Sequence, residues 1–589
     1  LFAALLFLPV LGGLFGKTEV KDAEVMSNLA LGSGADLETM DSFTGRYIRF
    51  LKTSFKYPAR SIASCLGLLV TIFLLYDIAG KGTRYFPEIP VDEGSVMVRA
   101  RGNISLQDAQ ALTLKVEEIV MRTEGIESTV TQINPDLGYS SSGGDDRVPV
   151  DVVGQIYFSL ADYKVRDLNS FELLQLLRER TKGIPGIIVE IGETEQGPPV
   201  GKDVQLQMRS SDYKSLESAV RASRAFFDSQ TSVLTDIEDN LPLPGIEWII
   251  DVDREKAGRF GTNVSAVGAM VQMITNGTKL GTYRPFDAEE EMDIRIRYPE
   301  EMRDIENMDS LRIITPRGQI PITNFIERKA TQRKVKIDRL DGERQITIKA
   351  NTMINPATGN KIAAEQAVDL VENWVSQQEF VDKVEYRFRG SDEESEAAAD
   401  FLGGAMATAL SMMFIILLMQ FNSFYFAILT LSTAILSSFG VLVGLIIMQR
   451  EFIVIMTGIG IIALAGIVVN NAIVLIDTYQ RLRSHYPSSE EAILKASAQR
   501  LRPILITTAT TVIGMLPLAV GVSINVLTRT IEFGSPISFW WQDTALAISF
   551  GLTFSTIITL GILPVMIILP EKMAPYWAEL KSVIKVKTS

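Results

Sequence analysis

The feature that most constrains this chain is a stretch of 49 residues without a charged side chain, from Phe401 to Gln449. A helix needs roughly 20 apolar residues to cross the hydrocarbon core of a bilayer. The polar sequence Gln420-Phe-Asn-Ser-Phe424 divides the stretch into two parts of suitable length. Buried helices of soluble proteins are usually shorter and interrupted by charges, so we expect two consecutive membrane-spanning helices here.

Other charge-free stretches add four further spans and part of another. One begins at Ser61 and stays apolar past Asp77 to Gly80, and the others cover 452–476, 503–528 and 544–570. The run 1–16 is too short and is typical of the end of a span. Because residue 1 lies inside an apolar run and no basic signal-peptide start precedes it, we interpret the chain as missing its beginning.

Lysine and arginine indicate how these spans are oriented. Basic residues collect in three segments that the span count places on one side, and such segments usually face the cytoplasm. Residues 81–400 then lie on the other side, in the periplasm of a bacterium with two membranes. The basic residues are Arg46, Arg49, Lys52, Lys56 and Arg60; Arg481, Arg483, Lys495, Arg500 and Arg502; and Lys572, Lys581, Lys585 and Lys587.

The outside region has the periodicity of a soluble α+β domain with a repeated unit. Its first part reads strand, helix, strand, strand, helix, strand, which is the ferredoxin-like split βαβ pattern. The expected strands are 96–100, 126–133, 150–158 and 187–191, and the expected helices are 106–122 and 171–181.

A second unit of the same kind follows, with an insert in its middle. Its first half is predicted at 204–208, 216–227 and 232–237, and its second half at 344–350, 363–375 and 381–388. The insert, about 239–342, has its own strand at 247–252 and helix at 264–274. Two adjacent units would form a cleft of the kind in which ligands bind, although two purely structural modules would give the same pattern.

Three motifs in the apolar region resemble the resistance–nodulation–division (RND) family of membrane exporters. Gly466-Ile-Val-Val-Asn470-Asn471-Ala472-Ile-Val-Leu-Ile-Asp477 is similar to a helix in the second half of these proteins. Arg500-Leu-Arg502-Pro503-Ile-Leu-Ile-Thr507 resembles the helix after it, and the segment from Gly551 to Leu560 resembles the last one. The motifs have the family's order and spacing, and the resemblance extends over essentially the whole chain.

The resemblance implies the RND permease fold, an α-helical transmembrane bundle with a periplasmic α+β domain of split βαβ subdomains, normally in a homotrimer. It implies that the chain is the C-terminal half of such a subunit. The expected parts are the end of a first-half helix (1–16), a cytoplasmic linker with an amphipathic helix (17–58), a transmembrane helix (59–80), a porter subdomain (81–200), a second porter subdomain (201–238 and 343–395), a docking insert (239–342), five transmembrane helices (396–570) and a cytoplasmic tail (571–589).

Family function implies proton-driven export of hydrophobic or amphiphilic compounds through the inner membrane, with a periplasmic adaptor and an outer-membrane channel as partners. A relative that exports metal ions, lipids or protein is the alternative, and a membrane-anchored periplasmic binding module is a further one. The family's paired relay aspartates are not in this chain, and Asn470 stands where many drug exporters have lysine. By resemblance, Asn470, Asn471, Thr507 and Arg500 belong to the proton relay; equally, buried polar residues often join membrane helices.

Candidate substrate contacts are less specific. Tyr157 and Phe158 lie on a predicted strand of the first unit, where aromatic rings can contact apolar compounds or pack in the core. Tyr139 lies in the glycine- and serine-rich segment 135–144, which we expect to be a loop. In related pumps a glycine-rich loop near this position gates substrate passage.

Composition excludes several other classes of function. The chain has one cysteine, Cys65, and one histidine, His485, so neither a thiolate metal site nor a histidine-based triad can be assembled. The net charge of −13 argues against nucleic acid as a partner. The phosphate-binding Gly-x-x-x-x-Gly-Lys-Ser/Thr sequence is absent. We therefore expect a transporter without a cofactor rather than an enzyme.

Overall fold

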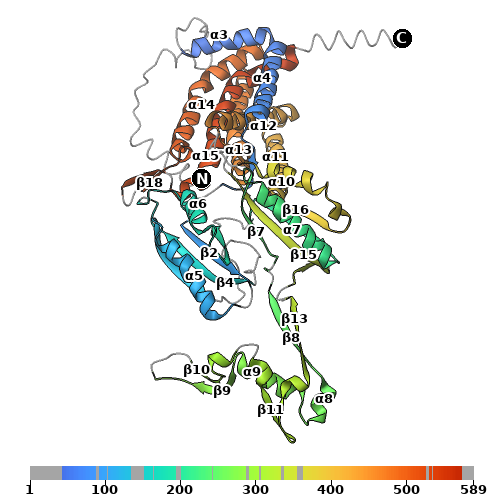
Figure 1. The fold of residues 1–589 in the computed structure, drawn as a ribbon. Helices are drawn as coiled ribbons and strands as arrows, with labels where there is room; N and C mark the ends of the chain where they lie inside the picture. The colour runs from blue at the N-terminus through green and yellow to red at the C-terminus, as the bar shows by residue number, and fades with distance from the viewer. Residues whose placement is uncertain are drawn as a thin grey trace, which may run out of the picture.

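The computed structural model describes residues 43–572 except 88–91, 102–103, 134–150, 164, 194–200, 242, 244, 287–290, 304–306, 333–336, 354–361, 526–528 and 534. The chain forms three regions along one long axis (Figure 1): a helix bundle, two α+β units side by side, and a small distal insert. The predicted spans 1–16, the linker before residue 43 and the tail after residue 572 lie outside the described residues.

Six helices in the described part of the chain are long and apolar enough to cross a membrane, as the sequence predicted. The predicted division of the long charge-free stretch is confirmed: Asn422, with a left-handed φ of 48°, ends α11, and the Ser423 side chain caps α12. The six helices are α4 (Pro58–Ala79), α11 (Ser391–Phe421), α12 (Phe424–Met448), α13 (Val454–Arg483), α14 (Ser489–Ala519) and α15 (Pro536–Gly561), which continues after a turn to residue 572.

Two predicted span boundaries were wrong. The span expected at 503–528 is α14, which begins at Ser489 and ends at Ala519. Gly521, with a φ of 74°, then leads into the hairpin β18 (Val522–Asn525) and β19 (Thr530–Phe533). The last span begins at Pro536, before Asp543, because proline is well tolerated in the first turn of a helix.

The two α+β units confirm the predicted split βαβ pattern and share one topology. In the first unit the sheet order is β3-β4-β2-β5, and in the second it is β7-β15-β6-β16, so equivalent strands occupy equivalent places. The first unit comprises β2 (Glu93–Ala100), α5 (Leu106–Met121), β3 (Ile126–Ile133), β4 (Val152–Leu160), α6 (Ser170–Thr181) and β5 (Ile187–Glu193). The second comprises β6 (Val204–Ser210), α7 (Tyr213–Ser229), β7 (Leu234–Asp239), β15 (Glu343–Thr352), α10 (Ala364–Val375) and β16 (Glu385–Arg389).

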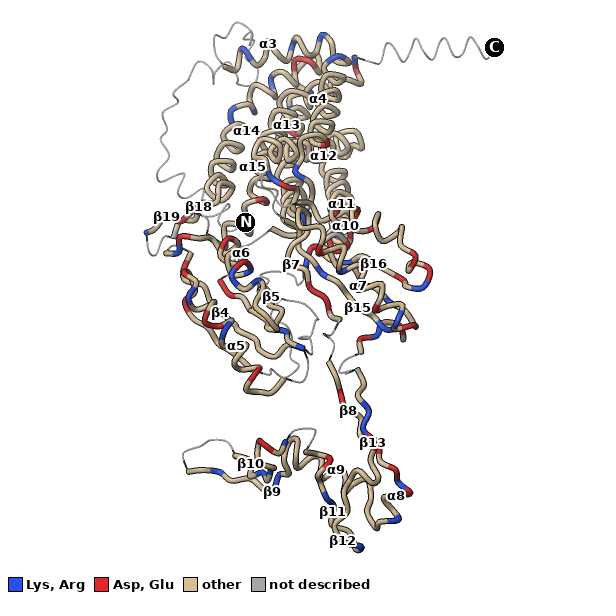
Figure 2. The backbone as a smooth tube through the Cα atoms, viewed as in Figure 1, with Lys and Arg blue, Asp and Glu red and all other residues tan. Residues whose placement is uncertain are grey.

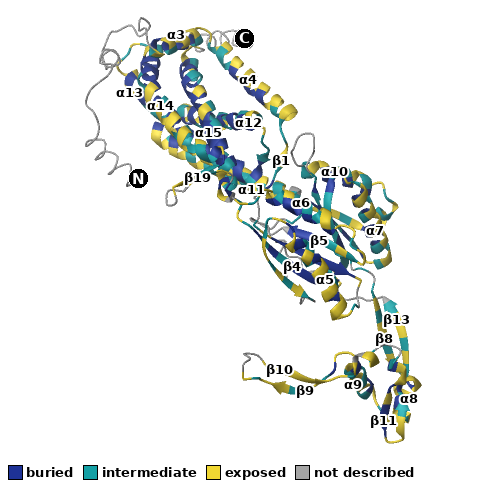
Figure 3. Ribbon diagram, turned by 60° about the vertical axis from the view of Figure 1, so that its left-hand side comes forward, coloured by how far each residue is buried: buried dark blue, intermediate teal, exposed yellow. Residues whose placement is uncertain are grey.

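The insert joins the second unit between β7 and β15. It extends away from the bundle on the antiparallel pair β8 (Ile246–Val252) and β13 (Ile326–Gln332). At its end, α9 (Val264–Ile274) lies near the hairpin of β9 (Thr278–Tyr283) and β10 (Met292–Ile296). This hairpin projects from the insert, and most of its residues are exposed (Figure 3).

Close approach of α12 and α15 holds the centre of the bundle. Gly440 and Gly444 lie one turn apart on α12 and face Phe554 and Phe550 of α15. A Cβ atom at Gly440 would lie 2.4 Å from Cβ of Phe554 and 2.9 Å from the carbonyl oxygen of Phe550. Only glycine therefore allows this contact, as in the small-residue interfaces that are typical of membrane helices.

Candidate functional site

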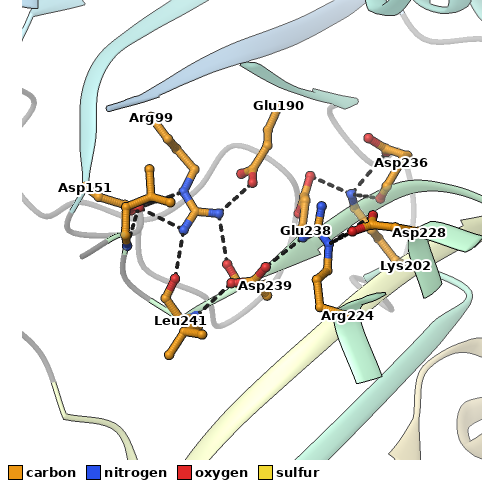
Figure 4. Close-up of polar contacts among 11 residues, drawn as sticks. Arg99, Asp151, Glu190, Lys202, Arg224, Asp228, Asp236, Glu238, Asp239 and Leu241 are labelled. Atoms are coloured by element: carbon orange, nitrogen blue, oxygen red, sulfur yellow. Dashed lines mark hydrogen bonds and ion pairs between the residues drawn. The ribbon is translucent and has the colours of Figure 1, made fainter. Parts of the chain in front are cut away.

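A network of buried and partly buried ion pairs joins the two split units, and we call it the charged seam. It consists of Arg99, Asp151, Glu190, Lys202, Arg224, Asp236, Glu238 and Asp239. Figure 4 shows these side chains meeting between the sheets of the two units. The first unit contributes the first three residues, and the second unit contributes the others.

Arg99 is the centre of the first half of the seam. Its guanidinium, with 2% of the side chain exposed, donates to both carboxylate oxygens of Asp151 and, at 2.7 Å, to Glu190. The same group also donates to the backbone carbonyls of Asp239 (3.1 Å) and Leu241 (3.2 Å) in the second unit (Figure 4). One side chain therefore binds both acids of its own unit and the backbone of the other.

Strand β7 supplies the acidic residues in the second half of the charged seam. Lys202 pairs with Asp236 at 3.1 Å and with Glu238 at 2.5 Å, and Arg224 pairs with Asp239 at 2.7 Å. Arg178 on α6 of the first unit reaches Asp236 at 3.3 Å and crosses between the units. A bulge against β15 gives Asp236 a left-handed φ of 54°, a conformation that non-glycine residues adopt only where surrounding contacts hold them.

Burial and charge divide the carboxylates into two kinds. Burial raises the pKa of Glu238 to about 7, although Lys202 opposes the shift. Burial likewise raises the pKa of Glu190 against the opposing effect of Arg99. The pKa of Asp236 is instead lowered, because Lys202 and Arg178 together outweigh its burial. Asp236 thus keeps the negative charge beside Lys202, while Glu238 accepts a proton more readily.

The polar residues predicted in the bundle lie in different surroundings. Asn470 on α13 and Thr507 on α14 are exposed on the outer surface of the bundle, whereas Asn471 is buried. Thr507 donates to the carbonyl of Ile504 (2.9 Å) on its own helix. Arg500 connects α14 to α13 by donating to Oγ1 of Thr478 at 2.7 Å. A relay role for these four residues therefore stays a prediction.

Asp543 lies just before the expected span 544–570, but the structure places it inside α15. Only 1% of its surface is exposed, and Arg450 pairs with it at 2.8 Å. Next to Arg450, Glu451 pairs with Arg84 at 3.0 Å, and β1 (Thr83–Arg84) runs parallel to β17 (Phe452–Ile453). These contacts connect the start of the first split unit to the bundle.

The predicted substrate residues also differ in how far they are buried. Phe158 is 3% exposed and packs in the core of the first unit, where its ring fills the space left by Gly94. Its position therefore favours core packing over substrate contact. Tyr157 is half-buried on β4, and Tyr139 lies outside the described residues. No group of three or more His, Cys, Asp or Glu side chains suited to hold a metal ion occurs among the described residues.

Sequence reasoning missed the charged seam. Arg99 and Asp239 are far apart along the chain, so no local motif connects them. One signal was present: Arg99 lies in the predicted apolar strand 96–100, where a charged residue implies a buried partner.

A family model described as the AcrB/AcrD/AcrF family matches residues 1–570. The chain is 25% identical over 528 residues to the cobalt-zinc-cadmium resistance protein CzcA of Cupriavidus metallidurans, covering 84% of this chain and 46% of that protein. It is also 25% identical over 563 residues to the multidrug resistance protein MdtC of Erwinia tasmaniensis, covering 93% of this chain and 50% of that protein.

The fold is likewise similar to a solved structure described as a heavy metal efflux pump. The TM-score is 0.72 at 21% identity, and the match covers 90% of this chain and 51% of that one. The chain thus spans about half the length of the relatives that it matches. With the family match over residues 1–570, these similarities show that the chain belongs to the AcrB/AcrD/AcrF family of RND permeases.

Proposed function

We propose that this chain is part of a secondary active transporter that exports hydrophobic or amphiphilic compounds at the expense of a proton gradient. The observation that carries the proposal is the family match over residues 1–570. The arrangement of the molecule supports it, because two split units lie directly on a bundle of apolar helices (Figure 1). A compound released from the membrane would meet the region between these units first.

For proton coupling, we propose that the exposed polar side of α13 and α14 faces further helices of the complete transporter. Asn470, Thr507 and Thr510 are exposed there, and Thr511 is partly exposed. Amide and hydroxyl groups are better satisfied against protein than against hydrocarbon. Asn470 would then accept or donate a hydrogen bond to a titrating carboxyl group, and Arg500 would hold α13 and α14 at a fixed spacing.

Location and partners follow from the same arrangement. We assign the bundle to a bacterial inner membrane and the split units to the periplasm, so that the insert points toward an adaptor and an outer-membrane channel. The hairpin β9–β10 exposes Leu280, Tyr283, Met292 and Ile294. Exposed apolar side chains grouped on one arm are typical of protein contacts, and they support a homotrimer in which this arm meets a neighbouring subunit.

A second candidate is export of metal ions. The similarity to CzcA, and to the solved structure described as a heavy metal efflux pump, favours it directly. The similarity to MdtC favours organic compounds to the same extent, since both proteins are 25% identical to this chain. The two candidates differ in cargo and share the proposed coupling.

Resistance and accumulation assays in a pump-deficient bacterium that expresses the gene distinguish these candidates. We expect lower ethidium accumulation and higher tolerance of deoxycholate, both lost when a protonophore collapses the gradient. Higher tolerance of zinc, cobalt or cadmium, without an effect on ethidium, would select metal export. Asn470→Leu should reduce export without reducing the amount of protein in the membrane, and unchanged export would refute the coupling role of Asn470.

A further inference from the structure

Helix α3 (Phe43–Lys56) lies across the end of the bundle where α4 begins (Figure 1). It buries Ile48, Leu51 and Phe55 in the same core as side chains of α13 and α14. Its Tyr47 donates a hydrogen bond to the carbonyl of Leu560 on α15 at 2.8 Å. One face of α3 is therefore fixed to this end of the bundle.

The exposed side of α3 and the first turn of α4 carries only positive charge. Figure 2 shows basic residues along α3, and its cations, together with Arg60, are exposed. The sequence contains no Asp or Glu from residue 43 to residue 76. Within the described part of the chain, no carboxylate lies within ion-pair distance of Arg46, Arg49, Lys56 or Arg60.

At the bend between α3 and α4, two of these cations lie close to the aromatic ring of Tyr57. Nζ of Lys56 lies 5.6 Å from the centre of the Tyr57 ring, and Cζ of Arg60 lies 4.9 Å from it. Two like charges near one ring repel each other, so an external anion that contacts both Lys56 and Arg60 would stabilise this arrangement. We call Lys56, Tyr57 and Arg60 the cationic corner.

Aromatic side chains beside the cations indicate which anion fits. Phe43 is 68% exposed and Phe50 is 57% exposed, and their spacing of seven residues places both on one side of α3. A helix with exposed aromatic residues beside Lys and Arg lies in the plane of a membrane, with the rings among acyl chains and the cations at the phosphates. A free anion would use the cations but leave the rings in water.

We propose that the cationic corner binds the headgroup of an anionic phospholipid, with Lys56 and Arg60 contacting its phosphate and Arg46 and Arg49 attracting further anionic lipid. Zwitterionic lipids also carry a phosphate, but their own cation neutralises it, so net negative charge determines the preference. The inference requires that the bundle lies in a membrane and does not require that the protein transports anything.

Lipid titration of the purified full chain in neutral detergent tests this proposal. The probe is phosphatidylglycerol with a fluorescent acyl chain, displaced by unlabelled phosphatidylglycerol or by phosphatidylcholine of the same chain length. We expect displacement by the anionic lipid only. At low salt the variant K56Q/R60Q should bind the probe roughly 30-fold more weakly, because each basic residue near a lipid surface contributes about a fivefold factor.

The matched control is K256Q/R259Q, which removes two exposed cations from the distal insert and should leave lipid affinity unchanged. Equal displacement by phosphatidylcholine, or unchanged affinity of K56Q/R60Q, would overturn the proposal. If circular dichroism shows that the double variant has lost helix, R60Q alone takes its place, with an expected loss of roughly fivefold. Unchanged affinity of R60Q would then be equally decisive.

Discussion

The charged seam and the centre of the helix bundle both lie largely out of solvent, but different groups hold them together. In the seam, full charges from two units meet in pairs of 2.5–3.3 Å. Between α12 and α15, glycine allows the backbones to approach. Hydroxyl groups supply polar contacts in the bundle, such as Thr508 of α14 with Thr556 of α15 at 2.8 Å. The difference teaches that the seam depends on contacts between opposite charges, whereas the bundle depends on shape.

The largest expected effect comes from removing the central cation of the seam. Arg99→Met should lower the free energy of unfolding by about 3–5 kcal/mol, because it leaves Asp151 and Glu190 buried without their partner. Hydrogen exchange of β2 and β5 in the detergent-solubilised chain measures the loss locally. Arg209→Met is the matched control, since Arg209 forms ion pairs with Asp341 and Glu385 at an exposed position. Equal exchange in both variants would contradict the role of pairing in the seam.

This contrast also explains how far the sequence predicted the structure. Membrane spans can be predicted because every residue of a long segment must suit the apolar interior of the bilayer. The split units can be predicted because apolar and polar residues alternate along their strands. The charged seam depends on pairs such as Arg99 with Glu190, which only the tertiary fold brings together. No local pattern predicts that Asp543 pairs with Arg450, which follows a different helix.

A proton on Glu238 should change the stability of the seam by a smaller amount. Because the folded protein raises the pKa of Glu238 to about 7, folding favours the protonated form. The stabilisation is therefore complete below the ordinary glutamic acid pKa and is lost as the pH rises through about 7. Between pH 5 and pH 8, wild type should lose roughly 2–3 kcal/mol relative to Glu238→Gln, which cannot titrate.

Urea unfolding at both pH values, followed by tryptophan fluorescence, measures this difference. Trp374 is a suitable reporter, because its ring stacks on Phe226 in the second unit at 4.4 Å. The control Glu385→Gln removes a carboxylate that is 68% exposed and should show the same pH dependence as wild type. If the stability of Glu238→Gln falls in parallel with that of wild type, another group titrates in this range.

Within the bundle, the smallest possible change at a helix contact isolates the effect of shape. Gly440→Ala adds one methyl group that would meet Phe554 and the backbone of α15, so the two helices must separate or α15 must shift. We expect about 1–3 kcal/mol of destabilisation, typical of overpacking, measured as loss of helix by circular dichroism during unfolding in sodium dodecyl sulfate. Gly514→Ala is the matched control, because its Cβ would meet no heavy atom within 4 Å among the described residues, and alanine should favour the helix there. Equal stability of the two variants would mean that the bundle does not depend on this close contact, and the contrast with the seam would then be one of polarity alone.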